Sequence, residues 1–101
     1  MARKPATRKA TSVGLPEILD IKAAAPLAEQ LLALRCGPVK VDASKVTRLG
    51  GQCVQVLLSA AATWKVDDTP FDLETPSDAF LSGLGLLGLS PEHISDKGSL
   101  A

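Results

Sequence analysis

The residues best placed to bind something stand at the start of the longest predicted helix, which covers residues 49–66. Gly50 and Gly51 carry no side chain that can cap this helix. Its first backbone N–H groups therefore lack partners within the helix, and the positive end of the helix dipole lies behind them. A protein partner could bring its backbone or a carboxylate close to these groups, since two Cβ atoms are missing. The alternative is that water satisfies them and glycine merely fits a tight turn.

An uncharged polar stripe follows the two glycines. Gln52, Gln55 and Ser59 fall on one side of the predicted helix. Exposed helix faces usually carry Lys and Glu, so neutral polar residues suit a protein interface, where a buried charge would be costly. The alternative is an ordinary solvated face. Arg48, just before the helix, is either a charged contact at the rim of that interface or a solvated loop residue.

Asp42 is the last residue of a predicted strand, and Ser44 lies in the loop between that strand and this helix. They either contact the partner or accept hydrogen bonds from loop backbone, as Asp and Ser commonly do in turns. The second role is the favoured one. The candidate partner-binding residues are Asp42, Ser44, Arg48, Gly50, Gly51, Gln52, Gln55 and Ser59.

The sequence gives no support for catalysis. His93, the single histidine, falls in a predicted polar end, and neither cysteine has a histidine at readable spacing to act as its base. Cys36 and Cys53 with one histidine do not make a zinc site, which normally needs four ligands. A helix N-terminus can lower the pKa of a thiol such as Cys53, but the favoured interpretation is a small buried packing residue. We expect no enzymatic activity, no metal and no cofactor.

The charges of the chain are unevenly distributed. Eleven basic residues balance eleven acidic ones, but four of the basic residues lie in the first nine positions, so the remainder is acidic overall. That balance argues against a nucleic-acid-binding face. The basic start lacks the apolar run of a signal peptide, and no stretch is long and apolar enough to span a bilayer. We expect a cytoplasmic protein that inserts into no membrane, and without a signal peptide we do not favour a disulfide.

Hydrophobic periodicity predicts the order strand, helix, strand, helix, strand, helix. The strands are expected over residues 13–19, 38–42 and 71–74, and the helices over residues 26–35, 49–66 and 76–87. Such alternation predicts an α/β fold with a mostly parallel sheet on which the helices pack. The domain should cover residues 13–89, between a basic tail at 1–12 and a polar tail at 90–101.

Several local signals refine these elements. Pro26 fits only the first turn of a helix, so a separate short turn over residues 21–24 is expected before it. Gly37 is expected to cap the end of that helix. Thr75 is expected to cap the third helix, with Pro76 at its first position. The residues expected on the buried side of the helix at 49–66 are Val54, Leu57, Leu58, Ala61 and Trp64.

The run PVKVDASKVTRLGGQCVQVLL, which ends at Leu58, resembles the central segment of STAS domains. In that family a strand ends in an acidic or amide residue, matched here by Asp42. A loop with one buried apolar residue follows, matched by Val46, and then a helix opens with small residues. The resemblance covers residues 13–89 and implies a STAS-type fold with a small, mixed or mostly parallel sheet.

Within the family, two segments resemble small stand-alone STAS proteins associated with bacterial chemotaxis. These are LGGQCVQVLLSA followed by Trp64, and the junction PFDLETPS. Such proteins are thought to dock on the histidine kinase CheA and to modify its phosphotransfer with response regulators. The resemblance therefore implies a non-catalytic adaptor with CheA as its protein partner.

One departure from the family pattern concerns phosphorylation. Anti-sigma-factor antagonists are switched by a phosphorylated serine at the start of the equivalent helix, and that position falls at Gly51, with the preceding acid at Gly50. Glycine has no hydroxyl, so this switch is not expected here, and Ser44 and Thr47 do not stand at the helix start. An anti-sigma-factor antagonist is thus the least favoured alternative. The other is a small STAS subunit of an ABC-type lipid-transport complex.

Overall fold

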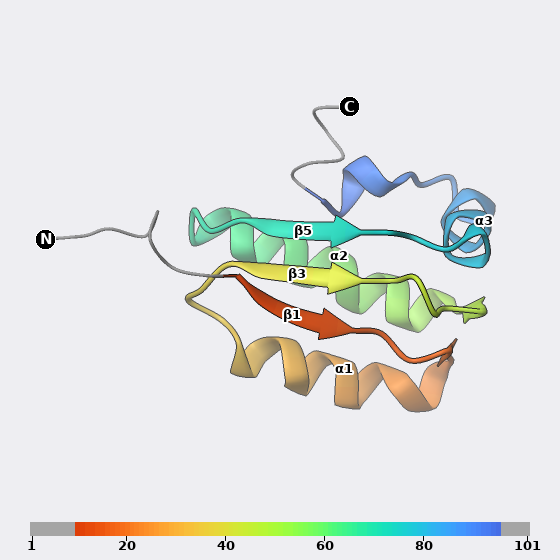
Figure 1. Ribbon diagram of the computed structural model, residues 1–101, viewed down its shortest axis with the longest axis horizontal. Helices are drawn as coiled ribbons and strands as arrows, with labels where there is room; N and C mark the ends of the chain where they lie inside the picture. The colour runs from red at the N-terminus through yellow and green to blue at the C-terminus, as the bar shows by residue number, and fades with distance from the viewer. Residues whose placement is uncertain (1–9, 96–101) are drawn as a thin grey trace, which may run out of the picture.

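Three short parallel strands form the central sheet of the molecule (Figure 1). The computed structural model describes residues 10–95, and in this range β1 (Thr11–Gly14), β3 (Val39–Asp42) and β5 (Phe71–Glu74) lie in the order β1-β3-β5. Both neighbouring pairs run parallel. The α/β class and the parallel sheet predicted from the sequence are confirmed.

Alternate residues of the strands face the helices, as the twofold repeat of a strand requires. The register sets Val13, Val41 and Leu73 in one row, and all three side chains are buried. The intervening positions are polar. Among them, Lys40 Nζ lies 3.8 Å from Glu74 Oε2 on the neighbouring strand. The sheet therefore has one apolar face, which carries the core, and one polar face.

The predicted first strand is divided in two. β1 ends at Gly14, and β2 (Ile18–Leu19) pairs with β4 (Arg48–Leu49) in a separate two-stranded parallel sheet. Pro16 lies between β1 and β2 and, having no backbone N–H, it cannot continue the ladder. Pro16 thus marks a complete break between two small sheets.

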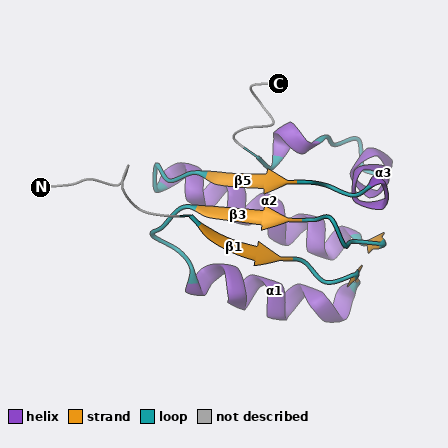
Figure 2. Cartoon of the chain, in the orientation of Figure 1, coloured by secondary structure: helices purple, strands orange, loops and turns teal. Residues whose placement is uncertain are grey.

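Three helices accompany the strands, and each begins at the carboxyl end of the sheet (Figure 2). α1 (Ile21–Ala33) lies beside β1 and contacts α2 (Gly51–Val66), which crosses the sheet on its apolar side. α3 (Asp78–Leu86) packs against β4. The α2 helix is the longest element, as predicted. Its buried residues are Cys53, Val54, Leu57, Ala60 and Trp64, while Leu58 and Ala61 are only half-buried.

The predicted break before Pro26 is wrong, because α1 is one continuous helix from Ile21 with Pro26 inside it. Asp20 explains the early start, since its Oδ1 accepts hydrogen bonds from the backbone N–H groups of Lys22 at 3.1 Å and Ala23 at 3.2 Å. This capping satisfies donors that the helix itself leaves without partners. It fixes the first turn ahead of the proline.

The predicted cap at Gly37 is also wrong. α1 ends at Ala33, and the left-handed residue after it is Cys36, with φ of 81°. Gly37 instead serves the core, because its carbonyl oxygen accepts a hydrogen bond from Trp64 Nε1 at 2.8 Å. Trp64 is buried, with its ring centroid 5.5 Å from that of Phe71 in an edge-to-face arrangement. Trp64 is therefore a core residue, as the sequence favoured.

α3 begins later than predicted. Ser77 is its N-cap, and its Oγ accepts from the N–H of Phe80 at 3.0 Å, whereas Thr75 lies before the helix with φ of 48°. The Ser77 hydroxyl also donates a hydrogen bond to the carbonyl oxygen of Val46 at 2.6 Å. This contact with a distant loop favours Ser77 over Thr75 as the N-cap. Gly88, with φ of 74°, follows the C-cap residue Leu87 in the left-handed conformation common after helices.

The residues after α3 are more ordered than a polar tail. They form the 3-10 helix η2 (Pro91–His93), and Ile94 and Ser95 after it are both buried. The Ser95 hydroxyl accepts a hydrogen bond from the backbone N–H of Leu73 at 2.8 Å. At the other end, Thr11 and Ser12 belong to β1 and not to the tail. The rest of both predicted tails, residues 1–9 and 96–101, lies outside the described residues.

We predict that Ser95→Ala destabilises the domain, because the buried N–H of Leu73 would lose its acceptor. A buried donor without a partner costs about 1–3 kcal/mol, which should lower the Tm by roughly 4–8 °C per kcal/mol in a domain of this size. Thermal and urea unfolding would measure the change. Ser12→Ala, at an exposed strand position, is the control and should shift the free energy of unfolding by less than about 0.5 kcal/mol. Equal stability of both variants would contradict the role given to Ser95.

Candidate functional site

Whereas Gln55 and Ser59 lie further along α2, part of the candidate set lies at one end of the sheet. Because the three strands are parallel, their carboxyl ends and the starts of the helices meet there. Asp42 ends β3, Arg48 lies in β4, and Gly50 is the N-cap of α2. The fold thus brings together residues that the sequence grouped only by their order along the chain.

The two glycines have different surroundings. A Cβ on Gly50 would lie 3.2 Å from the carbonyl oxygen of Leu19, to which the Gly50 N–H donates a hydrogen bond at 2.8 Å. Close approach of β2 therefore accounts for Gly50. A Cβ on Gly51 would meet no atom of the described chain within 4 Å. Gly51 faces open space at the start of α2, where no side chain caps the helix.

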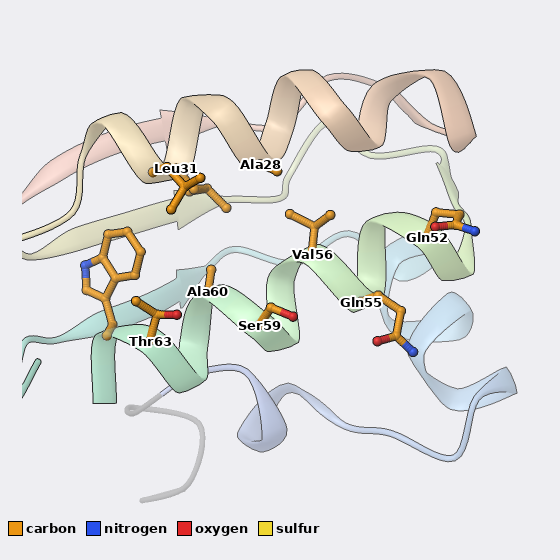
Figure 3. Close-up of a pocket in the computed structure, with 10 residues that line it drawn as sticks. Ala28, Leu31, Gln52, Gln55, Val56, Ser59, Ala60 and Thr63 are labelled. Carbon is orange, nitrogen blue, oxygen red and sulfur yellow. The ribbon is translucent and has the colours of Figure 1, made fainter. Parts of the chain in front are cut away.

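The predicted uncharged stripe lies along a groove between α1 and α2 (Figure 3). Gln52, Gln55 and Ser59 are exposed and line this groove, which has a volume of about 310 Å³. Their aliphatic neighbours come from both helices. The other residues that line the groove are Ala28, Leu31, Leu32, Val56, Ala60, Thr63 and Trp64.

A second hollow lies on the other side of the two glutamines. It has a volume of about 550 Å³ and includes Gly51, together with Gln52 and Gln55. Its apolar lining comes from α2 and from the chain after α3, at Val54, Leu58, Leu87 and Leu89. Leu87 is 52% exposed, although it falls within the third helix predicted from the sequence, at 76–87. The helix ends at Leu86, so Leu87 leaves the helical repeat and turns outward beside the hollow.

Asp42 holds its own loop. Its Oδ1 accepts a hydrogen bond from the backbone N–H of Ser44 at 2.9 Å. This bond, with a smaller contribution from the Ser44 side chain, lowers the pKa of the Asp42 carboxyl below its usual value. Asp42, Ser44 and Arg48 line neither hollow. The structural role favoured for Asp42 is the one that the geometry supports.

Cys53 is a packing residue. Its side chain is buried, and its thiol donates a hydrogen bond to the carbonyl oxygen of Asp20 at 3.3 Å, which joins α2 to the start of α1. Burial raises the pKa of the Cys53 thiol, with a further contribution from the Asp20 carboxylate. The thiol is thus less ionised than usual despite the nearby helix start. Neither Cys53 nor Cys36 is in a disulfide.

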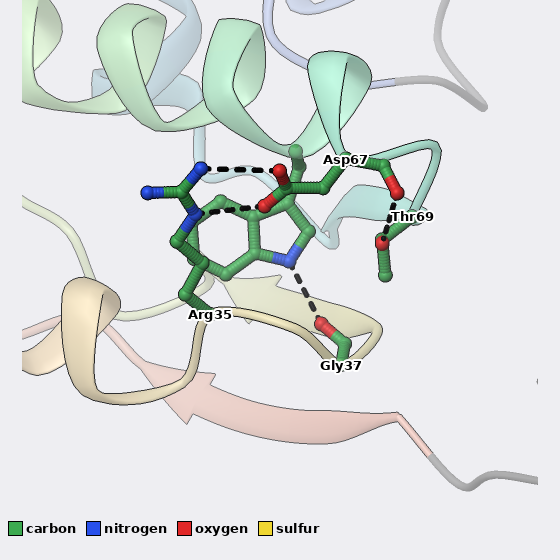
Figure 4. Close-up of polar contacts among 5 residues, drawn as sticks. Arg35, Gly37, Asp67 and Thr69 are labelled. Carbon is green, nitrogen blue, oxygen red and sulfur yellow. Dashed lines mark hydrogen bonds and ion pairs between the residues drawn. The ribbon is translucent and has the colours of Figure 1, made fainter.

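An ion pair that sequence reasoning missed joins the ends of α1 and α2 (Figure 4). Arg35 Nε lies 2.8 Å from Asp67 Oδ2, and Nη2 donates to Oδ1 at 3.1 Å. These hydrogen bonds raise the pKa of Arg35 and lower that of Asp67. The two residues are far apart in the sequence and both look like ordinary turn residues. The pair fixes the end of the α1–α2 layer that lies farthest from Gly51.

Comparison with known proteins identifies the family. A family model described as "Mlab, STAS domain" matches residues 2–93. The chain belongs to the STAS domain family. No curated protein and no solved structure matches the chain.

The family assignment agrees with the character of the surface. STAS domains are binding modules that mediate protein–protein interaction. Within residues 10–95, no group of three or more His, Cys, Asp or Glu side chains could hold a metal ion. The same residues contain no helix with the length and apolar character needed to cross a bilayer. This part of the STAS domain carries two open hollows that share the uncharged side chains of Gln52 and Gln55.

We predict that Asp42→Asn reduces the loss of stability in acid. The lowered pKa of Asp42 contributes stability that is fully present above the ordinary Asp pKa of about 3.9 and is lost as the pH falls through the lowered value. Thermal unfolding from neutral pH into acid should show Tm falling less steeply in the variant than in the wild type below about pH 4. Identical slopes would contradict the linkage.

We also predict that the two thiols differ sharply in reactivity. Cys36 is exposed and Cys53 is buried with a raised pKa, so a disulfide reagent at pH 8 should modify one thiol quickly in the native protein and the second only after unfolding. Cys36→Ser should remove the fast phase, and Cys53→Ser should keep it. A fast phase that survives Cys36→Ser would overturn the assignment of Cys53 as a packing residue.

Proposed function

We propose that this STAS domain is a non-catalytic adaptor that binds the chemotaxis histidine kinase CheA and modulates phosphotransfer between the kinase and its response regulators. The observation that carries the proposal is the open start of α2. Gly51 has free space around it, and the helix begins without a capping side chain. Gln52 and Gln55 flank that point and are exposed and uncharged.

The groups at this helix end are suited to binding a protein partner and not to catalysing a reaction. The first N–H groups of α2 can donate to a partner's carboxylate or carbonyl oxygen, and the helix dipole strengthens such a bond. Neighbouring glutamine side chains donate and accept hydrogen bonds without the desolvation cost of a charge. The half-buried and exposed leucines of the adjacent hollow, Leu58 and Leu87, add apolar area that a partner would cover.

The same helix end argues against a phosphorylation switch. Gly51 occupies the position of the phosphorylated serine in anti-sigma-factor antagonists and has no hydroxyl. Of the nearby hydroxyls, Thr47 Oγ1 donates to the carbonyl oxygen of Glu17 at 3.1 Å. Ser44 lies in the loop that Asp42 holds. We infer that the domain binds its kinase as a constitutive ligand and is not the kinase's substrate.

The choice of CheA rests on the two segments that resemble chemotaxis-associated STAS proteins. The first supplies the open start of α2 and its uncharged stripe. The second, PFDLETPS, supplies β5 and the cap of α3, the helix that leads to Leu87 and Leu89 of the hollow containing Gly51. The segments that carry the resemblance thus build the surface proposed for the kinase.

A second candidate is a subunit of an ABC-type lipid-transport complex. Some stand-alone STAS proteins hold an ATPase in its assembled state, and the family model that matches this chain is described as Mlab. This candidate would use the same open helix end with a different partner. Parallel titrations against CheA and against an ATP-binding cassette ATPase from the same genome separate the two.

We predict that Gly51→Glu abolishes or weakens binding of the CheA phosphotransfer region at least ~10-fold, which equals about 1.4 kcal/mol. The new side chain fills the open space, while a carboxylate at the helix start should keep the free energy of unfolding or raise it by about 0.3–1 kcal/mol through the helix dipole. Calorimetric titration measures the first effect and thermal unfolding the second.

Gly85→Ala is the matched control for this substitution. A Cβ on Gly85 also meets no atom within 4 Å, but Gly85 lies in α3 and lines neither hollow. The Gly85→Ala variant should be up to about 1 kcal/mol more stable than the wild type, because alanine favours a helix more than glycine does. It should bind the partner like the wild type. Absence of wild-type binding to CheA at high micromolar concentration, or phosphate incorporation from the kinase, would overturn the proposed function.

A further inference from the structure

We propose that the groove between α1 and α2 is the seat of one helix of the protein partner, and that the contacting side of that helix is apolar and uncharged. The inference builds on the proposed function, because the partner is the protein that binds at Gly51. It adds a second contact area, along the helices and away from the helix start.

The groove has room because a small residue lines it on each helix. Ala28 of α1 and Ala60 of α2 leave room that larger side chains would fill, and Val56 points from α2 toward Ala28 (Figure 3). Trp64, near the end of α2, also lines the groove. A volume of about 310 Å³ is at the low end for ligand pockets, which hold about 300–1,000 Å³. An open groove of this size suits a row of side chains more than an enclosed small molecule.

The exposed leucine on α1 marks the groove as an interface. Leu31 is buried and belongs to the core, but Leu32, the next residue, is 61% exposed and lines the groove. The core does not need Leu32, since α1 already packs through Leu27 and Leu31. Covering Leu32 would stabilise a complex by removing its apolar area from water.

The groove favours a neutral partner surface, because no charged side chain of α1 or α2 lines it. Lys22, Glu29 and Lys65 are the charged residues of α1 and α2, and none of them lines the groove. A charged side chain from a partner would therefore lose its hydration there without gaining a counter-charge. Along the α2 side, Gln55, Ser59 and Thr63 offer neutral donors and acceptors for polar groups at the edge of the partner helix.

The backbone of the groove walls decides between a helix and an extended strand. The N–H and C=O groups of α1 and α2 bond within their own helices, so the walls present side chains only. An extended peptide would leave half of its own backbone groups without partners against Leu32 and Val56. A helix satisfies its backbone internally and brings side chains at i, i+3, i+4 and i+7 to the groove.

A second copy of this chain fits the groove less well. A symmetric pair would set the same patch of each copy against the other, so that one concave groove would face another. The gap between them would remain unfilled. A convex helix fills it.

The groove also continues into the proposed contact at the helix start. Gln52 and Gln55 line both the groove and the hollow that contains Gly51. One partner can therefore cover the groove and the open helix end in a single contact area. The two substitutions, at Gly51 and in the groove, probe the two ends of that area.

The test uses Leu32→Glu and Ala28→Leu in the full chain, titrated against the CheA phosphotransfer region and, in parallel, against the ABC-type ATPase. Leu32→Glu places a charge in the groove, and Ala28→Leu fills it without a charge. Both should weaken binding of whichever partner the wild type binds by at least ~10-fold. Gln30→Glu is the control, because it adds the same charge to an exposed position of α1 that does not line the groove, and it should bind like the wild type.

The outcomes separate this inference from the proposed function. Binding of CheA that is unaffected by both groove variants would overturn the groove and leave the adaptor function standing. Binding of the ATPase alone, weakened by both variants, would overturn the CheA proposal and support the groove. A wild-type dimer in analytical ultracentrifugation that Leu32→Glu converts to a monomer would assign the groove to a second copy and overturn the inference, as would the absence of binding to either protein.

Discussion

The placement of the binding surface depends on the contacts of Trp64. Its indole packs edge-to-face on Phe71 of β5 and donates a hydrogen bond to the carbonyl of Gly37, in the turn between α1 and β3. One side chain thus fixes the end of α2 against the sheet and against the end of α1. The Arg35–Asp67 ion pair joins the same two helix ends from the solvent side. These contacts hold the two helix ends together. The distance between α1 and α2 along the groove is then set by the side chains that pack between the two helices.

The two glycines at the start of α2 have different roles: Gly50 is required by packing, and Gly51 is left open for a partner. Gly50 lets the carbonyl of Leu19 approach and so allows β2 and β4 to pair, whereas no neighbouring atom requires a glycine at Gly51. Cys53, one turn further on, bonds to the carbonyl of Asp20 and holds the start of α1 beside the start of α2. Gly50 and Cys53 therefore belong to the packing beneath the surface, whereas Gly51 lies on its open side.

Much of the fold follows from the sequence, because the apolar repeat distinguishes strands from helices wherever the elements are regular. The strand at 38–42, the helix that opens at the glycines and the buried Trp64 were predictable in this way. The errors occur where a distant contact outweighs a local preference. Ser77 caps α3 in place of Thr75 because its hydroxyl also reaches Val46. The stripe of Gln52, Gln55 and Ser59 was predictable, but the groove beside it was not, since it depends on how two helices pack.

The bond between Ser95 and Leu73 limits how this molecule can assemble. On the outer side of β5 a serine hydroxyl takes the place that the carbonyl of another strand would occupy. No further strand can add there while Ile94 and Ser95 stay packed. A sheet that is closed on one side can join at most one other sheet, through β1. Pairing between the three-stranded sheets of different copies would therefore stop at two copies, and this sheet cannot extend into a fibre.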